Sequence, residues 1–140
     1  MPKLTDRERD EFMRSLRYGI LTMQRADGSP VSVPVWFDWT GEMIRMFALA
    51  TSPKIARLKA RPEASLLVVN NLDEKEAWVA FDGPVAIMDD GGIELAETLA
   101  ARYWDLSEPR KAEMLEEWRA AASQIALLEL RPEKIRSYKD

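Results

Sequence analysis

The sequence predicts an α+β fold in which roughly six antiparallel strands form a barrel-like sheet with helices at its periphery. Short runs rich in β-branched and aromatic residues are joined by turn signals, so strands that are consecutive in the chain should pair as hairpins. The segments with helical periodicity do not alternate with these runs as βαβ units require. Gly83 and Pro84 also interrupt the longest apolar run, as happens where the strand of a barrel bends.

Hydrophobic periodicity and turn residues divide the chain, 1–140, into the elements of a single domain. We expect strands at 20–25, 31–39, 42–50, 64–69, 77–88 and 124–130, followed by a last short strand at 135–138. We expect helices at 6–17, 53–60, 93–103 and 109–122.

The first helix and hairpin rest on local signals. Thr5 and Glu8 have the spacing of a capping box, which marks a helix start. Asp27-Gly28 lies between two apolar runs and predicts a tight hairpin turn. Pro34 cannot donate a hydrogen bond to a neighbouring strand, so the second strand should lie at an edge of the sheet or carry a bulge.

The next segment, Met46-Phe-Ala-Leu-Ala-Thr-Ser-Pro-Lys54, is an apolar run that ends at a hydroxyl pair, a proline and a lysine. Ser52 is a favourable N-cap and Pro53 a favourable first helical residue, so a strand should lead directly into a helix. The free amides of that helix, its dipole and the Lys54 ammonium would together hold an anion such as phosphate. The same three residues also begin many ordinary surface helices.

Local stop signals and hydrophobic spacing also define the remaining elements. Arg61-Pro62 ends the helix before the strand at 64–69. A change to helical spacing after the turn residues 89–92 predicts two helices before the strand at 124–130. No repeat or low-complexity segment suggests a second domain.

Composition narrows the classes of function. The chain contains neither cysteine nor histidine, which removes disulfides, thiolate metal sites, the commonest metal ligand and the commonest general base. We therefore expect no metal site, and we expect redox or transfer chemistry to come from a bound organic cofactor. The net charge of −4 argues against broad binding to nucleic acid or to an anionic membrane. A charged N-terminus without an apolar segment predicts a cytoplasmic protein.

The order of several motifs resembles that of the pyridoxamine 5'-phosphate oxidase-like split β-barrel family. The resemblance covers nearly the whole chain. It rests on Asp27-Gly-Ser-Pro-Val-Ser-Val-Pro-Val-Trp-Phe37, Met46-Phe-Ala-Leu-Ala-Thr-Ser-Pro-Lys54, Leu58, Arg61-Pro62 and Phe81-Asp-Gly83. It implies a six-stranded split β-barrel that forms a homodimer, with FMN or the deazaflavin coenzyme F-420 bound at the subunit interface. It also implies a flavin-dependent oxidoreductase that acts on a small organic substrate.

The resemblance further implies which residues contact the cofactor. In the family, a strand like 33–38 runs beside the isoalloxazine ring, a second strand touches it, and a lysine grips the phosphate. The corresponding residues of this chain are Val33, Val35, Trp36, Phe47, Ala48 and Lys54, and we add Thr51, Ser52 and Arg57 as further phosphate contacts and Trp78 as a wall of the site. No catalytic residue is predicted.

Three departures argue against pyridoxamine phosphate as the substrate. Trp78 stands where the oxidases of the family carry a glutamine, and Pro53 replaces a basic residue beside the lysine. The helical insertion at 92–122 and the end of this sequence at Asp140 leave no counterpart to the arginine-rich, substrate-binding C-terminus of those oxidases. The chain is therefore more similar to the flavin or deazaflavin reductase branches of the family.

Several alternatives stay open at this point. Trp36 is either a cofactor wall or a dimer-interface residue. Trp104 and Trp118 either pack the inserted helices together or form a lid over the flavin. The cofactor is FMN or, alternatively, coenzyme F-420. A non-enzymatic protein that binds a flavin or haem is the remaining possibility.

Overall fold

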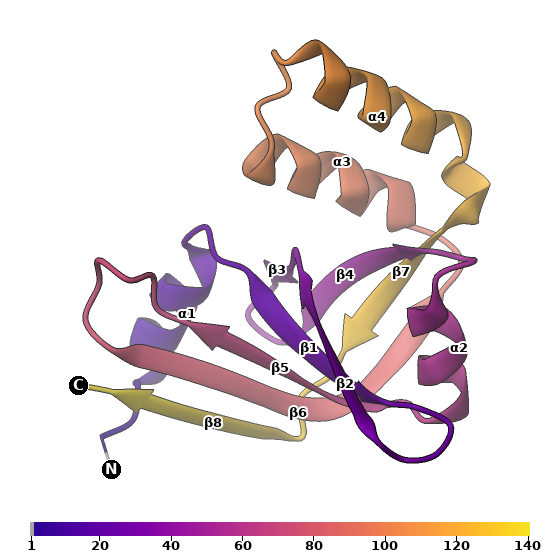
Figure 1. Ribbon diagram of the computed structural model, residues 1–140. Helices are drawn as coiled ribbons and strands as arrows, with labels where there is room; N and C mark the ends of the chain where they lie inside the picture. The colour runs from indigo at the N-terminus through magenta and orange to yellow at the C-terminus, as the bar shows by residue number, and fades with distance from the viewer. Residues whose placement is uncertain (1) are drawn as a thin grey trace.

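An eight-stranded antiparallel sheet dominates the computed structural model, which describes residues 2–140 (Figure 1). The strand order is β2-β1-β5-β6-β7-β4-β3, and β8 pairs with β6 outside this path. The strands are β1 (Gly19–Gln24), β2 (Pro30–Val35), β3 (Asp38–Trp39), β4 (Ile44–Leu49), β5 (Glu63–Val69), β6 (Ala77–Met88), β7 (Ile125–Leu130) and β8 (Lys134–Lys139). The helices are α1 (Asp6–Arg14), α2 (Pro53–Ala60), α3 (Gly92–Tyr103) and α4 (Pro109–Ala120), with a short 3-10 turn at Ala122–Gln124.

The predicted fold class is confirmed: the sheet curls into a half-open barrel, and the helices lie around it (Figure 1). The long strand β6 makes this curl possible because it changes partners along its length. Residues 78–84 pair with β5 and residues 85–88 pair with β7. The change falls at Gly83-Pro84, where the sequence predicted a bend. Gly83 is required there, because a Cβ atom would lie 2.2 Å from the carbonyl oxygen of Arg131.

The first helix and the second strand do not extend as far as the sequence predicted. The capping box of Thr5 and Glu8 forms as expected, but α1 ends at Arg14 and does not continue to residue 17. Ser15 adopts an extended conformation, and the Arg17 side chain folds back to donate to the carbonyl of Phe12.

The strand expected at 31–39 is divided into β2 and β3, with Trp36 and Phe37 between them. Burial still alternates through this break, since Val35, Phe37 and Trp39 are all buried. The division accounts for eight strands within residues 2–140 in place of the seven expected, of which the last short one is β8. β2 is an outer strand of the sheet, as Pro34 predicted.

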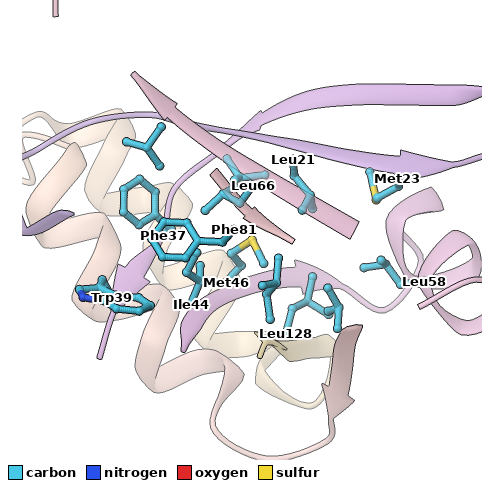
Figure 2. Close-up of a cluster of buried hydrophobic side chains, with 14 of the residues drawn as sticks. Leu21, Met23, Phe37, Trp39, Ile44, Met46, Leu58, Leu66, Phe81 and Leu128 are labelled. Atoms are coloured by element: carbon cyan, nitrogen blue, oxygen red, sulfur yellow. The ribbon is translucent and has the colours of Figure 1, made fainter. Parts of the chain in front are cut away.

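The main core fills the inside of the curled sheet, and Figure 2 labels ten of its side chains. They come from six strands, from α2 and from Phe37 in the segment between β2 and β3; they are Leu21, Met23, Phe37, Trp39, Ile44, Met46, Leu58, Leu66, Phe81 and Leu128. Each such side chain contributes about 1.5–3 kcal/mol when it leaves water. The Trp39 indole keeps its polar atom satisfied by donating to Asp10 over 2.9 Å.

The inserted helices α3 and α4 form a hairpin that lies outside the barrel, over β4 and β7 (Figure 1). Leu95 and Leu99 of α3 pack against Leu127 of β7 in a second, smaller apolar cluster. Trp36 and Phe47 border this cluster, so the hairpin also covers the break between β2 and β3. None of the helices in residues 2–140 is long and apolar enough to cross a membrane.

Candidate functional site

The corner between β4 and α2 has the local structure that the sequence predicted. α2 spans residues 53–60, as expected. Ser52 is its N-cap, in an extended conformation, and its side-chain oxygen accepts a hydrogen bond from the Lys54 amide over 3.3 Å. Pro53 is the first helical residue, where no amide hydrogen is needed. The positive end of the helix dipole therefore lies beside the Lys54 side chain.

Lys54 is a partly buried cation without a counter-ion. Within residues 2–140, no carboxylate lies within ion-pair distance of its ammonium group. Burial alone lowers the pKa of Lys54 below its usual value, because loss of water disfavours the charged form. An anion bound beside this cation would favour its charged form.

A cavity of about 410 Å³ opens beside this corner. It lies among the end of β2, the end of β4, the start of α2 and the α3–α4 hairpin. Its lining residues are Tyr18, Pro34, Val35, Trp36, Phe47, Ala48, Leu49, Ser52, Lys54, Trp104, Trp118 and Ile125. Among them Lys54 alone is charged at neutral pH, and the other residues are mostly apolar or aromatic. The volume and the lining are typical of a small-molecule site.

Aromatic rings form one wall of the cavity. Trp36 packs edge-on against Phe47 and against Trp104, with ring centroids 6.1 and 5.0 Å apart. Trp118 packs edge-on against Phe47 at 5.4 Å and stacks on Trp104 at 5.0 Å. These rings come from the barrel and from the inserted hairpin, so the wall exists only when the two parts fold together. Tyr103 stacks on the remaining face of Trp36.

The structure brings together six of the ten cofactor contacts expected from the sequence. Those that line the cavity are Val35, Trp36, Phe47, Ala48, Ser52 and Lys54. Four others do not line it. Thr51 is exposed in the turn before α2, and Val33 packs against the main core. Arg57 borders a separate depression with Gln24 and Arg61, on another side of α2.

Trp78 lies away from the cavity, on the outer face of the sheet. It belongs to β6 and pairs with Val69 of β5 and Tyr138 of β8. Leu67 and Val69 on the same outer face are 36% and 44% exposed. This sheet face, defined by Ile20, Leu67, Val69, Trp78 and Tyr138, is a continuous apolar surface. A surface of this kind is typical of a protein interface.

Six further residues line the cavity without having been among the expected contacts. They are Tyr18, Pro34, Leu49, Trp104, Trp118 and Ile125. Leu49 and Ile125 pair with each other across β4 and β7, so strand register would have revealed them. Trp104 and Trp118 were expected either to pack the inserted helices together or to form a lid. In the structure they stack on each other and also line the cavity.

A second cavity, of about 510 Å³, lies on the other side of the sheet near β5 and β6. Among its three carboxylates, Asp82 accepts hydrogen bonds from Ser65 over 2.7 Å and from Arg136 over 2.8 Å. Arg136 and then Ser65 hold the pKa of Asp82 below its usual value. The other charged residues that line this cavity, Glu63, Glu133 and Lys134, are exposed to solvent, unlike the partly buried Lys54.

One known protein family matches almost the whole chain. A family model for pyridoxamine 5'-phosphate oxidase matches residues 5–139. Among curated proteins, none matches the sequence.

Solved structures share the fold over nearly its whole length. An F-420 reductase is 25% identical, with a TM-score of 0.75 over 91% of this chain and 94% of that chain. A conserved hypothetical protein of Mycobacterium tuberculosis is 22% identical, with a TM-score of 0.73 over 97% of this chain and 85% of that chain. A FAD-binding protein of Mesorhizobium loti is 19% identical, with a TM-score of 0.66 over 97% of this chain and 93% of that chain.

Proposed function

Because this chain belongs to the pyridoxamine 5'-phosphate oxidase family, we propose that it is a flavin-dependent oxidoreductase that binds FMN beside Lys54. The observation that carries this proposal is a partly buried lysine, without a counter-ion, at a helix N-terminus inside an aromatic cavity.

The corner at Ser52 and Lys54 fits the phosphate of FMN. The Lys54 ammonium would donate charge-assisted hydrogen bonds to phosphate oxygens, and the dipole of α2 would favour the negative charge. The Ser52 hydroxyl, which already accepts the Lys54 amide, keeps its own proton free for donation to an oxygen. Phosphate binding would also return the pKa of Lys54 toward its ordinary value.

The rest of the cavity fits a flat, largely apolar ring system. Val35, Phe47 and Ala48 supply apolar contacts from β2 and β4, and Trp36 supplies an aromatic surface. When bound, FMN would supply the two-electron transfer to a small organic substrate, which the side chains of this protein cannot perform alone.

We propose that the substrate is not pyridoxamine 5'-phosphate. Within residues 2–140, Lys54 is the sole cation that lines the cavity, and the phosphate of FMN would neutralise it. No second cation would then remain in this subunit's cavity for a phosphate on the substrate. Arg136 on β8 does not line the cavity and is already paired with Asp82.

We also propose that two copies of the chain form a homodimer through the outer sheet face defined above. Tyr18 precedes β1 at the border of this face, is 60% exposed and lines the cavity. A partner packed on the face would therefore complete the open side of the cavity. Trp78, which lies on the face and away from its own subunit's cavity, is positioned to contribute to that interface.

Coenzyme F-420 is the alternative cofactor, supported by the 25% identity to an F-420 reductase. Its longer anionic tail would require more basic contacts than FMN. The single lysine of the cavity favours FMN, since Arg57 borders a different depression.

The spectrum of the purified protein tests the proposal. We expect a yellow protein, with a chromophore released on denaturation that has the mass of FMN. Release of F-420 would overturn the choice of cofactor but not the flavin site. A colourless protein with no measurable affinity for either compound would contradict the proposed function.

A further inference from the structure

The inserted α3–α4 hairpin contributes two tryptophans to a cavity whose other residues come from the barrel and α2. Trp104 is the C-cap of α3, and Trp118 lies in the last turns of α4. Their rings stack with centroids 5.0 Å apart and planes 29° from parallel. Both rings line the cavity, and both pack edge-on against Trp36.

The polar atoms of these two indoles are not engaged by the protein. Within the described part of the chain, neither Trp104 nor Trp118 donates its indole N–H to a protein acceptor, whereas Trp39 donates to Asp10 over 2.9 Å. No buried side-chain nitrogen or oxygen in residues 2–140 lacks a partner, so the two N–H groups are accessible from the cavity or from solvent. Trp104 stacks on Trp118 and has the Lys111 ammonium over its ring, 4.7 Å from the centroid, so Trp118 supplies the flat apolar surface, and both indoles supply a free hydrogen-bond donor.

The charge of the cavity limits what these rings can bind. No aspartate or glutamate lines it, and Lys54 is its one charged residue among residues 2–140. If the phosphate of FMN neutralises Lys54, the remaining space is uncharged and aromatic. An ionic substrate would lose its hydration there without gaining a partner.

We propose that Trp104 and Trp118 form the substrate subsite of this oxidoreductase and select flat, uncharged aromatic molecules that carry carbonyl oxygens. The ring of such a molecule would stack on Trp118, and a carbonyl oxygen would accept a hydrogen bond from an indole N–H of Trp104 or Trp118. This inference rests on the proposed function, because it requires FMN to occupy the phosphate corner. It assigns substrate selection to the inserted hairpin and cofactor binding to the barrel and α2.

Binding of 1,4-naphthoquinone to the FMN-loaded, oxidised protein tests the inference without turnover. Isothermal titration calorimetry should show binding to the wild type and about tenfold weaker binding to Trp104→Leu and to Trp118→Leu. The first variant loses an N–H donor and the ring that packs against Trp118, and the second loses the stacking surface. Trp118→Phe keeps a ring and should lose less affinity than Trp118→Leu. In the nitrogen-15 spectrum, the indole signals of Trp104 and Trp118 should shift on titration, and that of Trp39, which lies in the main core, should not.

Further measurements separate this inference from the proposed function. The compound 1,4-cyclohexanedione has two carbonyls but no aromatic plane, and it should bind about tenfold more weakly than the quinone. Glu113→Gln, an exposed change on α4, is the matched control and should leave quinone affinity unchanged. Unchanged quinone affinity in both leucine variants, or no binding to the wild type, would overturn the inference. Equal loss of quinone and FMN affinity would assign the tryptophans to the cofactor, whereas failure of the wild type to bind FMN would overturn the proposed function itself.

Discussion

Trp36 and Tyr103 stack with their ring centroids 5.0 Å apart and their planes 6° from parallel. Trp36 follows β2 in the barrel, and Tyr103 is the last residue of α3. The Tyr103 hydroxyl donates to the carbonyl of Arg17, and Arg102 pairs with Asp38 over 2.7 Å. These contacts fix the hairpin on the barrel, and they thereby position the aromatic wall of the cavity.

Lys54→Met should weaken FMN binding by about 1.5–3 kcal/mol, the scale of a hydrogen bond to a charged group. Methionine keeps most of the apolar stem, so the loss reports the ammonium group. Lys59→Met, on the exposed side of α2, is the matched control and should bind FMN as the wild type does. Fluorescence titration of the apo-protein measures both affinities. Equal affinities for the two variants would remove Lys54 from the site.

Leu67→Glu should convert the proposed homodimer into a monomer at micromolar concentration. Leu67 is 36% exposed in the middle of the apolar sheet face, and two copies of the change would place unpaired carboxylates in one interface. Sedimentation velocity measures the change in mass. Met88→Glu, at the other end of β6 and 41% exposed, should leave the oligomeric state unchanged. A monomeric wild type would contradict the interface.

Tyr103→Phe should lower the free energy of unfolding by about 1 kcal/mol, because the partly buried carbonyl of Arg17 loses its hydrogen bond from the tyrosine hydroxyl. Burial raises the pKa of Tyr103, so the hydroxyl stays protonated throughout the neutral range. Urea unfolding followed by circular dichroism measures the loss. If Tyr103→Phe matches the wild type, the hydroxyl contributes nothing to holding the hairpin.

The ion pair of Arg17 and Glu74 should make stability depend on acidic pH. Arg17 is 5% exposed and donates to Glu74 over 2.8 Å, and this bond, followed by one from the Asn71 amide, lowers the pKa of Glu74 from 4.5 to about 2. A carboxyl whose pKa is lower in the folded state stabilises the protein above the unfolded value, and this contribution disappears as the pH falls toward the folded value. The urea concentration at the midpoint of unfolding should therefore decrease as the pH is lowered from 4.5 to about 2.

Glu74→Gln isolates this contribution. The variant should have a lower urea midpoint than the wild type at neutral pH, because the buried Arg17 loses its counter-ion. It should also lose less stability on acidification, since one titrating group is gone. Parallel pH profiles for the two proteins would show that the pair does not link folding to pH.

Local sequence signals predicted the corner between β4 and α2, because the structure there is local. Ser52 and Pro53 determine where α2 begins, and Arg61-Pro62 determines where it ends. The Gly83-Pro84 pair likewise marked the point at which β6 changes partners.

Other features depend on contacts between distant segments, which periodicity does not encode. The alternation of buried residues continues through Phe37, although the hydrogen-bonded ladder of β2 stops at Val35. The place of Trp104 and Trp118 in the cavity wall depends on how the hairpin folds back on β4 and β7. Arg57 was expected beside Lys54 from its spacing, but its side chain borders a separate depression with Gln24 and Arg61.

The central claim is that Lys54 holds the phosphate of FMN. A comparison of FMN with riboflavin, which lacks only the phosphate, tests this most directly when it is made in the wild type and in Lys54→Met. We predict that the wild type binds FMN at least about tenfold more tightly than riboflavin, and that most of this preference disappears in Lys54→Met. Equal affinity of the wild type for the two flavins, or the same preference in both proteins, would contradict it.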